Sequence, residues 1–283
     1  MRMLLAAALV GAAAAAEAAP VSLVAAENVY GDIAAEVGGD DVRVTSILSN
    51  PAQDPHEFEA GAAAARALAD ARVVIYNGAD YDPWIVRLLR ASPSPARQTI
   101  VVAELLHRNA GDNPHLWYDP AAAPAVAKAA AETLARLDPA HEAEYRRRLA
   151  AFEASLRPLA DRIALLRGKY AGTSVTATEP VFGYMADALG LDMRNARFQL
   201  AVMNGTEPSA GDVAAFENDL RGRKVKALIF NVQTGEALSE RMRAIAEESG
   251  VPVVPVTETE PAGTPYRQWI EAELDALDRA LSR

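Results

Sequence analysis

Short apolar stretches alternate with helix-like stretches along most of this 283-residue chain, and this alternation limits the possible fold more than any other feature. Apolar residues in the helix-like stretches recur at helical spacing. Strands separated by helices pair in parallel, because each helix crosses over a face of the sheet to reach the next strand. We predict strands at 21–26, 41–48, 72–78 and 99–105 in the first half, and at 174–178, 198–204, 225–232 and 251–256 in the second.

The alternation stops at residues 139–170, where one helical pattern runs without a strand. A helix of this length would extend roughly 45 Å at 1.5 Å per residue, which is more than one small lobe needs. Pro158 lies inside the pattern and predicts a kink or a break. We therefore predict an α/β fold of two parallel-sheet lobes joined by a long connecting helix. The expected segments are a leader at 1–18, a first lobe at 19–138, the connecting helix at 139–170 and a second lobe at 171–283.

The first 18 residues have the pattern of a cleavable secretory leader. Arg2 precedes an apolar stretch, and Ala16-Glu17-Ala18 fits the small-x-small rule for cleavage after Ala18. The apolar core is shorter than the roughly 20 residues that a membrane span needs. Cysteine is absent, which excludes disulfides, thiolate ligands and lipid attachment through cysteine. We expect a periplasmic protein that is soluble and monomeric.

The net charge of −10 argues against a nucleic-acid partner, which would need clustered lysine and arginine. Several enzyme signatures are also missing from the sequence. There is no G-x-S-x-G, no Walker A loop, no strand–GxGxxG–helix and no HExxH. We expect neither an organic cofactor nor a catalytic residue.

Metal-binding side chains follow four of the predicted strands. Ligands of parallel sheets collect beyond the carboxyl ends of the strands. His56 in DPHEFE and His115 in NPHLWYDP follow strands of the first half, whereas Glu179 and Glu258 follow strands of the second half. These four residues predict an ion in the cleft between the lobes.

Other interpretations of these residues remain open. Glu179 could serve a helix dipole, and Glu260 could replace Glu258 as the fourth ligand. His107, in a polar loop, could also contribute. His115 has a rigid apolar frame of Pro114 and Trp117, which suits a metal ligand. Asp119 is expected to be the N-cap of a helix over 119–137.

These loops resemble the bacterial periplasmic zinc- and manganese-binding proteins of ABC importers, the TroA/ZnuA-like family. The likeness covers nearly all of the mature chain and includes DPHEFE, NPHLWYDP, TATEPVFGYMADALGL and PVTETEP. It implies two lobes, a stiff connecting helix and docking onto a membrane permease. Carried over by position, the metal ligands would be His56, His115, Glu179 and Glu258.

The resemblance also bears on the identity of the metal. Zinc-binding relatives often have a third histidine at the position of Glu179, whereas manganese-binding relatives commonly have glutamate there and aspartate at the position of Glu258. Two imidazoles and two carboxylates accept manganese, iron(II) or zinc. We expect capture and delivery of Zn²⁺ or Mn²⁺, with zinc slightly favoured and a metal chaperone as a possible further partner. Alternatives are a binding protein for a metal chelate and, less strongly supported, a metal-dependent hydrolase.

Overall fold

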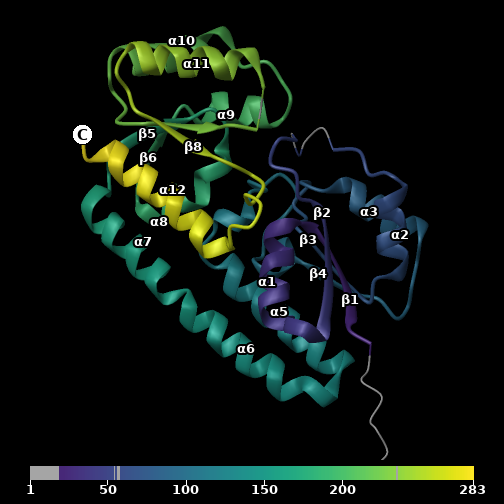
Figure 1. The fold of residues 1–283 in the computed structure, drawn as a ribbon. Helices are drawn as coiled ribbons and strands as arrows, with labels where there is room; N and C mark the ends of the chain where they lie inside the picture. Colours follow the sequence, from purple (N-terminus) through teal and green to yellow (C-terminus); the bar gives the residue numbers. More distant parts are fainter. Residues whose placement is uncertain (1–18, 54, 56–57, 234) are drawn as a thin grey trace, which may run out of the picture.

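The protein has two lobes, each built on a four-stranded sheet (Figure 1). The computed structural model describes residues 19–53, 55, 58–233 and 235–283. The predicted leader and His56 lie outside the described residues. The first sheet has the order β2-β1-β3-β4 and the second has the order β6-β5-β7-β8. The strands are β1 (Val21–Glu27), β2 (Val42–Leu48), β3 (Val73–Tyr76), β4 (Gln98–Val101), β5 (Ser174–Ala177), β6 (Asp192–Arg194), β7 (Leu228–Asn231) and β8 (Val253–Val256).

All six strand pairings among the described residues are parallel, which confirms the predicted α/β class. The two sheets repeat the same order, so each has a switch point between its first and third strands in chain order. The α-helices of the lobes are α1 (Asn28–Gly38), α2 (Ala62–Asp70), α3 (Pro83–Ala91), α4 (Val102–Leu105), α5 (Ala122–Leu137), α8 (Gly183–Leu189), α9 (Ala196–Met203), α10 (Ala210–Arg221), α11 (Ala237–Glu248) and α12 (Tyr266–Leu281). Short 3-10 helices are η1 (Gly39–Asp41), η3 (Leu116–Tyr118), η4 (Pro139–His141) and η5 (Pro180–Phe182). No helix of the described residues combines the length and apolar character needed to cross a bilayer.

The connection between the lobes consists of α6 (Glu142–Ser155) and α7 (Arg157–Tyr170), which run along one side of the molecule in teal (Figure 1). The helix divides at Leu156, as Pro158 predicted. Proline lacks a backbone N–H and its ring crowds the carbonyl four residues earlier, so the regular hydrogen-bond ladder is interrupted there. Helix α12 packs beside α7 and reaches back to α1, where the Tyr266 backbone N–H donates to Asp32 Oδ2 at 3.1 Å. Helix α12 therefore links the second lobe to the first in addition to the α6–α7 connection.

One predicted element of the second lobe was wrong, and one strand was missed. The stretch 198–204 is not a strand but most of α9, and the edge strand is β6, which was not predicted. A strand would place Phe198, Leu200 and Val202 on one face. Instead Phe198 and Val202 are buried and Leu200 is 44% exposed, which is helical spacing.

Two predicted boundaries in the first lobe also need correction. The strand predicted to reach Leu105 ends at Val101, and residues 102–105 form α4. Helix α5 begins at Ala122, so Asp119 is not its N-cap. The Asp119 carboxylate instead accepts the backbone N–H of Ala121 at 2.9 Å, in the turn that precedes the helix.

The aromatic ring of Tyr118 joins the cores of the two lobes. It lies 5.3 Å from the ring of Phe182 and 5.7 Å from the ring of Trp269, edge to face in both cases. Tyr118 itself is fully buried. Edge-to-face pairs of this kind add about 0.5–1.5 kcal/mol each beyond the area that they bury. The loop that carries His115 is thus packed against the second lobe.

At the start of the connecting segment, His141 forms an ion pair that predicts a measurable pKa. Its Nδ1 lies 2.6 Å from Asp138 Oδ2, and this hydrogen bond raises the pKa of His141 above the ordinary 6.5. The stabilisation that the pair gives is therefore fully present below pH 6.5 and is lost as the pH rises through the folded-state pKa. An NMR titration of the His141 ring should give a midpoint above 6.5, and Asp138→Asn should lower it. A wild-type midpoint at or below 6.5 would contradict this assignment.

Candidate metal site

His115 is buried within an aromatic frame at the carboxyl edge of the first sheet. Its side chain has no solvent exposure. The ring of Trp117 lies 5.5 Å from the imidazole and the ring of Tyr81 lies 6.0 Å from it, both edge to face. Pro114 limits the backbone just before it. The rigid frame expected from the sequence is present, and Tyr81 adds to it.

The side chain of Asn113 fixes the orientation and tautomer of His115. Asn113 Oδ1 lies 2.7 Å from His115 Nδ1 and also accepts the His115 backbone N–H at 3.2 Å. Because an amide oxygen only accepts, Nδ1 carries the proton. The other end of the Asn113 side chain donates to the carbonyl of Pro180 at 2.7 Å, across the lobe boundary. His115 Nε2 is thereby directed toward the second lobe.

Glu179 and Glu258 project from the second lobe toward the same point. His115 Nε2 lies 3.3 Å from Glu258 Oε2, although the two residues belong to different lobes. Asn231 Nδ2 lies 2.6 Å from Glu179 Oε2 and 2.7 Å from Glu258 Oε1, and donates one hydrogen to each carboxylate. Strand β7 lies between β5 and β8, so its last residue reaches the loops that follow both neighbours. The fold therefore brings His115 into contact with Glu258 and joins Glu179 to Glu258 through the Asn231 amide.

Tyr81 contributes a hydrogen-bond donor from the first lobe. Its hydroxyl donates to Glu258 Oε2 at 3.0 Å. Burial, followed by the nearby Glu258 carboxylate, raises the pKa of Tyr81 well above its usual value, so the hydroxyl keeps its proton. The preceding residues 78–80 all have left-handed backbones, with φ of 76°, 50° and 64°. Such a conformation is unfavourable for residues other than glycine and is concentrated at functional sites.

Gln233 ties the Glu258 loop to the segment that leads to His56. Its Oε1 accepts the backbone N–H groups of Glu258 at 2.6 Å and of Thr259 at 2.8 Å. Its Nε2 donates to the carbonyl of Gln53 in the first lobe at 3.0 Å. One side chain thus links backbone segments of the two lobes beside the predicted ligands.

Glu260 lies among different neighbours from Glu258. Its backbone N–H donates to Asn28 Oδ1 at 3.2 Å, and Asn28 Nδ2 donates to its carbonyl at 2.7 Å. Burial and, after it, the Asp32 and Glu36 carboxylates of α1 together raise the pKa of Glu260 to about 9. Of these two glutamates, Glu258 is the one that contacts His115.

Among the described residues, the histidines and acids do not by themselves form a group of three or more with the spacing of a metal site. The fourth predicted ligand, His56, lies outside that part of the chain. His107 is exposed, at a left-handed position (φ 55°) after α4. His115 and Glu258 are in direct contact, and Glu179 joins them through the Asn231 amide.

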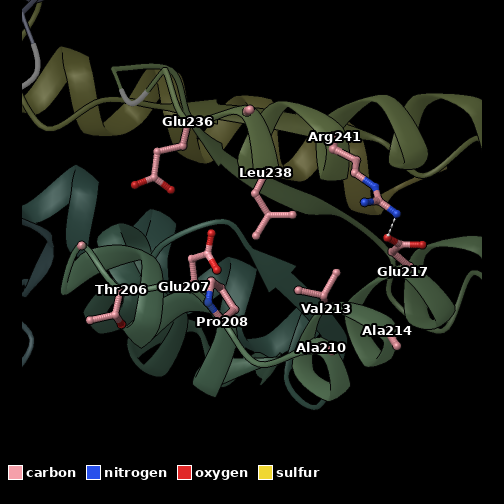
Figure 2. A pocket seen from close by; sticks show the side chains of 12 residues that line it. Thr206, Glu207, Pro208, Ala210, Val213, Ala214, Glu217, Glu236, Leu238 and Arg241 are labelled. Carbon is pink, nitrogen blue, oxygen red and sulfur yellow. Dashed lines mark ion pairs between the residues drawn. The ribbon is translucent and has the colours of Figure 1, made fainter.

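A hollow of about 800 Å³ lies elsewhere, on the outer part of the second lobe (Figure 2). It lies between α10 and α11, and the Glu217–Arg241 ion pair marks one end (Figure 2). Its lining contains neither His115 nor the carboxylates of Glu179 and Glu258. The candidate site is instead a polar cluster between the lobes, in which the side chains of His115 and Glu258 have no solvent exposure.

Sequence reasoning missed the three amides and the tyrosine around the ligands. Asn231 ends β7 and Gln233 follows it, at the carboxyl edge of the sheet, and position at this edge was the rule that selected the histidine and the glutamates. Restricting that rule to ionisable groups excluded them. The non-glycine residues beside Gly78 gave no signal for the left-handed turn before Tyr81.

Comparison with known proteins identifies the family. Residues 23–280 match the family described as zinc-uptake complex component A periplasmic, ZnuA. The chain belongs to the ZnuA family. This confirms the resemblance drawn from the loop motifs. Members of the ZnuA family are substrate-binding components of ABC importers and are not enzymes.

Individual relatives of this ZnuA-family chain are distant but cover most of its length. A putative metal-binding protein of Treponema pallidum is 24% identical over 281 residues, covering 90% of this chain and 85% of that protein. The iron ABC transporter substrate-binding lipoprotein MtsA of Streptococcus pyogenes is 20% identical over 287 residues, covering 93% and 89%.

The fold of a solved ZnuA-type protein matches closely. The periplasmic zinc-binding protein TroA from Treponema pallidum superposes with a TM-score of 0.78 at 20% identity, over 94% of this chain and 100% of that chain. At this identity the match shows a shared fold, with two parallel-sheet lobes. The names of the relatives include both zinc and iron, so they leave the metal of this ZnuA-family chain undecided.

Proposed function

We propose that this chain captures one divalent transition metal between its lobes and delivers it to the membrane permease of an ABC importer. The ligands would be His115, Glu179 and Glu258, with His56 as the fourth. The main support is the 3.3 Å approach of His115 Nε2 to Glu258 Oε2, between two fully buried side chains of different lobes. Buried ionisable groups from two lobes are costly to bring together unless a shared cation or proton compensates them.

The spacing of the donors suits a small cation. Two ligand bonds of about 2.0–2.1 Å at a tetrahedral angle place their donor atoms about 3.3–3.4 Å apart. The His115–Glu258 distance of 3.3 Å is compatible with this geometry. A set of imidazole and carboxylate donors also accepts manganese and iron(II). We propose zinc as the first candidate cargo and manganese as the second.

Ligands from both lobes would make the ion a bridge between them. Binding should therefore stabilise the closed arrangement and raise the melting temperature. We also propose that residues 1–18 are removed as a secretory leader and that residues 19–283 act as a monomer in the periplasm. In this proposal the segments 19–138, 139–170 and 171–283 remain the two lobes and their connection.

Metal titration of the metal-free protein tests this function. Purified residues 19–283 should bind one equivalent of zinc or manganese, and Mg²⁺ at the same concentration should serve as the unbound control. Deleting the gene should impair growth in metal-depleted medium, and the metal that restores growth identifies the cargo. Binding of no transition metal at micromolar concentration would contradict the proposal.

A further inference from the structure

Asn231 is positioned to control how the two candidate carboxylate ligands meet an ion, an inference that rests on the proposed function. Its Nδ2 lies 2.6 Å from Glu179 Oε2 and 2.7 Å from Glu258 Oε1. Its Oδ1 accepts the Gln233 backbone N–H at 3.1 Å, and the residue is 1% exposed. The amide is therefore held at both ends, and its two hydrogens point at one oxygen of each carboxylate.

We propose that Asn231 sets the metal preference of the site by holding Glu179 and Glu258 as ligands that each use one oxygen. Glu258 places Oε1 on the amide, while Oε2 faces His115 Nε2. In a chelating carboxylate both oxygens bind the ion, so the oxygen that accepts from Asn231 would have to turn toward the ion and share its lone pairs between the two. One oxygen from each carboxylate and two imidazoles give four ligand atoms. Four-coordinate sites suit zinc, whereas manganese favours octahedral, oxygen-rich sites.

Neighbouring hydrogen bonds also hold the Glu258 carboxylate and backbone in place. Tyr81 donates to Glu258 Oε2 from the first lobe, and Gln233 holds the Glu258 backbone N–H. Asn231 ends β7, between the two strands that lead to the glutamates. Rotation of either carboxylate would break a buried hydrogen bond, and buried polar groups are costly to leave unpaired.

The chemistry of an amide fits this role better than that of a charged donor. A lysine at the same place would neutralise the carboxylates but would also repel the incoming cation. The neutral amide supplies two donors without competing for the negative charge. Asn231 is thus a positioning residue, acting on the ion through the two glutamates.

The test compares wild type, Asn231→Ala and Asn195→Ala. Asn195 is the matched control, because its amide donates to the Asp219 carboxylate elsewhere in the same lobe. Dissociation constants for zinc and for manganese are measured by chelator competition, and the melting temperature is measured without metal. Asn231→Ala should lower the affinity for zinc by about tenfold or more, as the loss of groups that orient metal ligands commonly does. The affinity for manganese should fall less, so the preference for zinc over manganese should decrease. Asn195→Ala should keep the wild-type ratio.

X-ray absorption of zinc-loaded wild type provides a measurement that needs no variant. It should give four nitrogen or oxygen neighbours, and a shell of five or six with chelating carboxylates would overturn the inference. So would an equal loss of both affinities in Asn231→Ala, or a ratio within twofold of wild type. If one of these results is obtained but His115→Ala still abolishes metal binding, the role of Asn231 is wrong and the proposed metal-binding function is retained. A wild type that binds neither metal would overturn both proposals.

Discussion

Replacing His115 with alanine is expected to weaken zinc binding by at least roughly a hundredfold, since even groups that only orient metal ligands are worth tenfold to a hundredfold. His115 Nε2 faces Glu258 Oε2 at 3.3 Å, and Asn113 fixes the proton on the opposite ring nitrogen. The variant therefore lacks the nitrogen donor contributed by the first lobe at this point. Calorimetry or chelator competition on the purified protein measures the change.

Melting curves should report the same loss. An ion at 1,000 times its dissociation constant stabilises the folded state by about 4 kcal/mol. For a protein of this size we expect a rise in melting temperature of roughly 10 °C in wild type. His115→Ala should lose most of this rise, whereas His107→Asn, at an exposed histidine, should retain it. A full metal-induced rise in His115→Ala would exclude this residue as a ligand.

Glu273 lies in a buried cluster that requires it to be protonated. Its Oε1 accepts from the Thr257 backbone N–H at 3.1 Å and from Trp269 Nε1 at 2.8 Å. The Tyr118 hydroxyl lies 2.7 Å from both the Thr257 carbonyl and Glu273 Oε2. A hydroxyl has one hydrogen, so the second of these short contacts needs a proton from Glu273. Burial raises the pKa of Glu273 from 4.5 to about 8, which agrees with this assignment.

Glu273→Gln should therefore change how stability depends on pH. In wild type the raised pKa stabilises the protonated folded state, and this contribution is lost as the pH rises from 4.5 to about 8. Glutamine keeps a donor toward Tyr118 and an acceptor toward Thr257 without titrating. The free energy of unfolding of Glu273→Gln, relative to that of wild type, should therefore increase by several kcal/mol between pH 4.5 and 9, at about 1.4 kcal/mol per pKa unit.

Thermal or urea unfolding of the two proteins across this pH range measures the difference. Glu271→Gln, at a partly exposed position of the same helix, should leave the pH dependence of wild type unchanged. Parallel curves for wild type and Glu273→Gln would show that Glu273 is ionised in the folded protein.

The sequence predicted the sheets well wherever a strand was buried and apolar, as in β1, β3, β7 and β8. It failed at the edge of the second sheet. There β6 has only three residues, two of them charged, and the apolar run after it forms α9. Local hydrophobicity cannot distinguish a short apolar helix from a buried strand when the deciding contacts come from distant residues. Phe198 of α9, for example, packs on Phe216 of α10.

The ionisable residues of the candidate site could be predicted from the sequence because they follow the ends of predicted strands. His115, Glu179 and Glu258 were named from their positions after strands, and the fold joins them by direct contact or through the Asn231 amide. Asn113, Asn231 and Gln233 were not named, because the hydrogen bonds of an amide depend on three-dimensional contacts. Asn113 reaches Pro180 and Gln233 reaches Gln53, each across the lobe boundary.

The most direct test of the proposed site is a crystal structure of the zinc-loaded protein with anomalous scattering measured at the zinc edge. We expect a single strong peak within about 2.0–2.2 Å of His115 Nε2 and of one oxygen each from Glu179 and Glu258. A zinc peak bound elsewhere, or ligated from one lobe alone, would contradict the account.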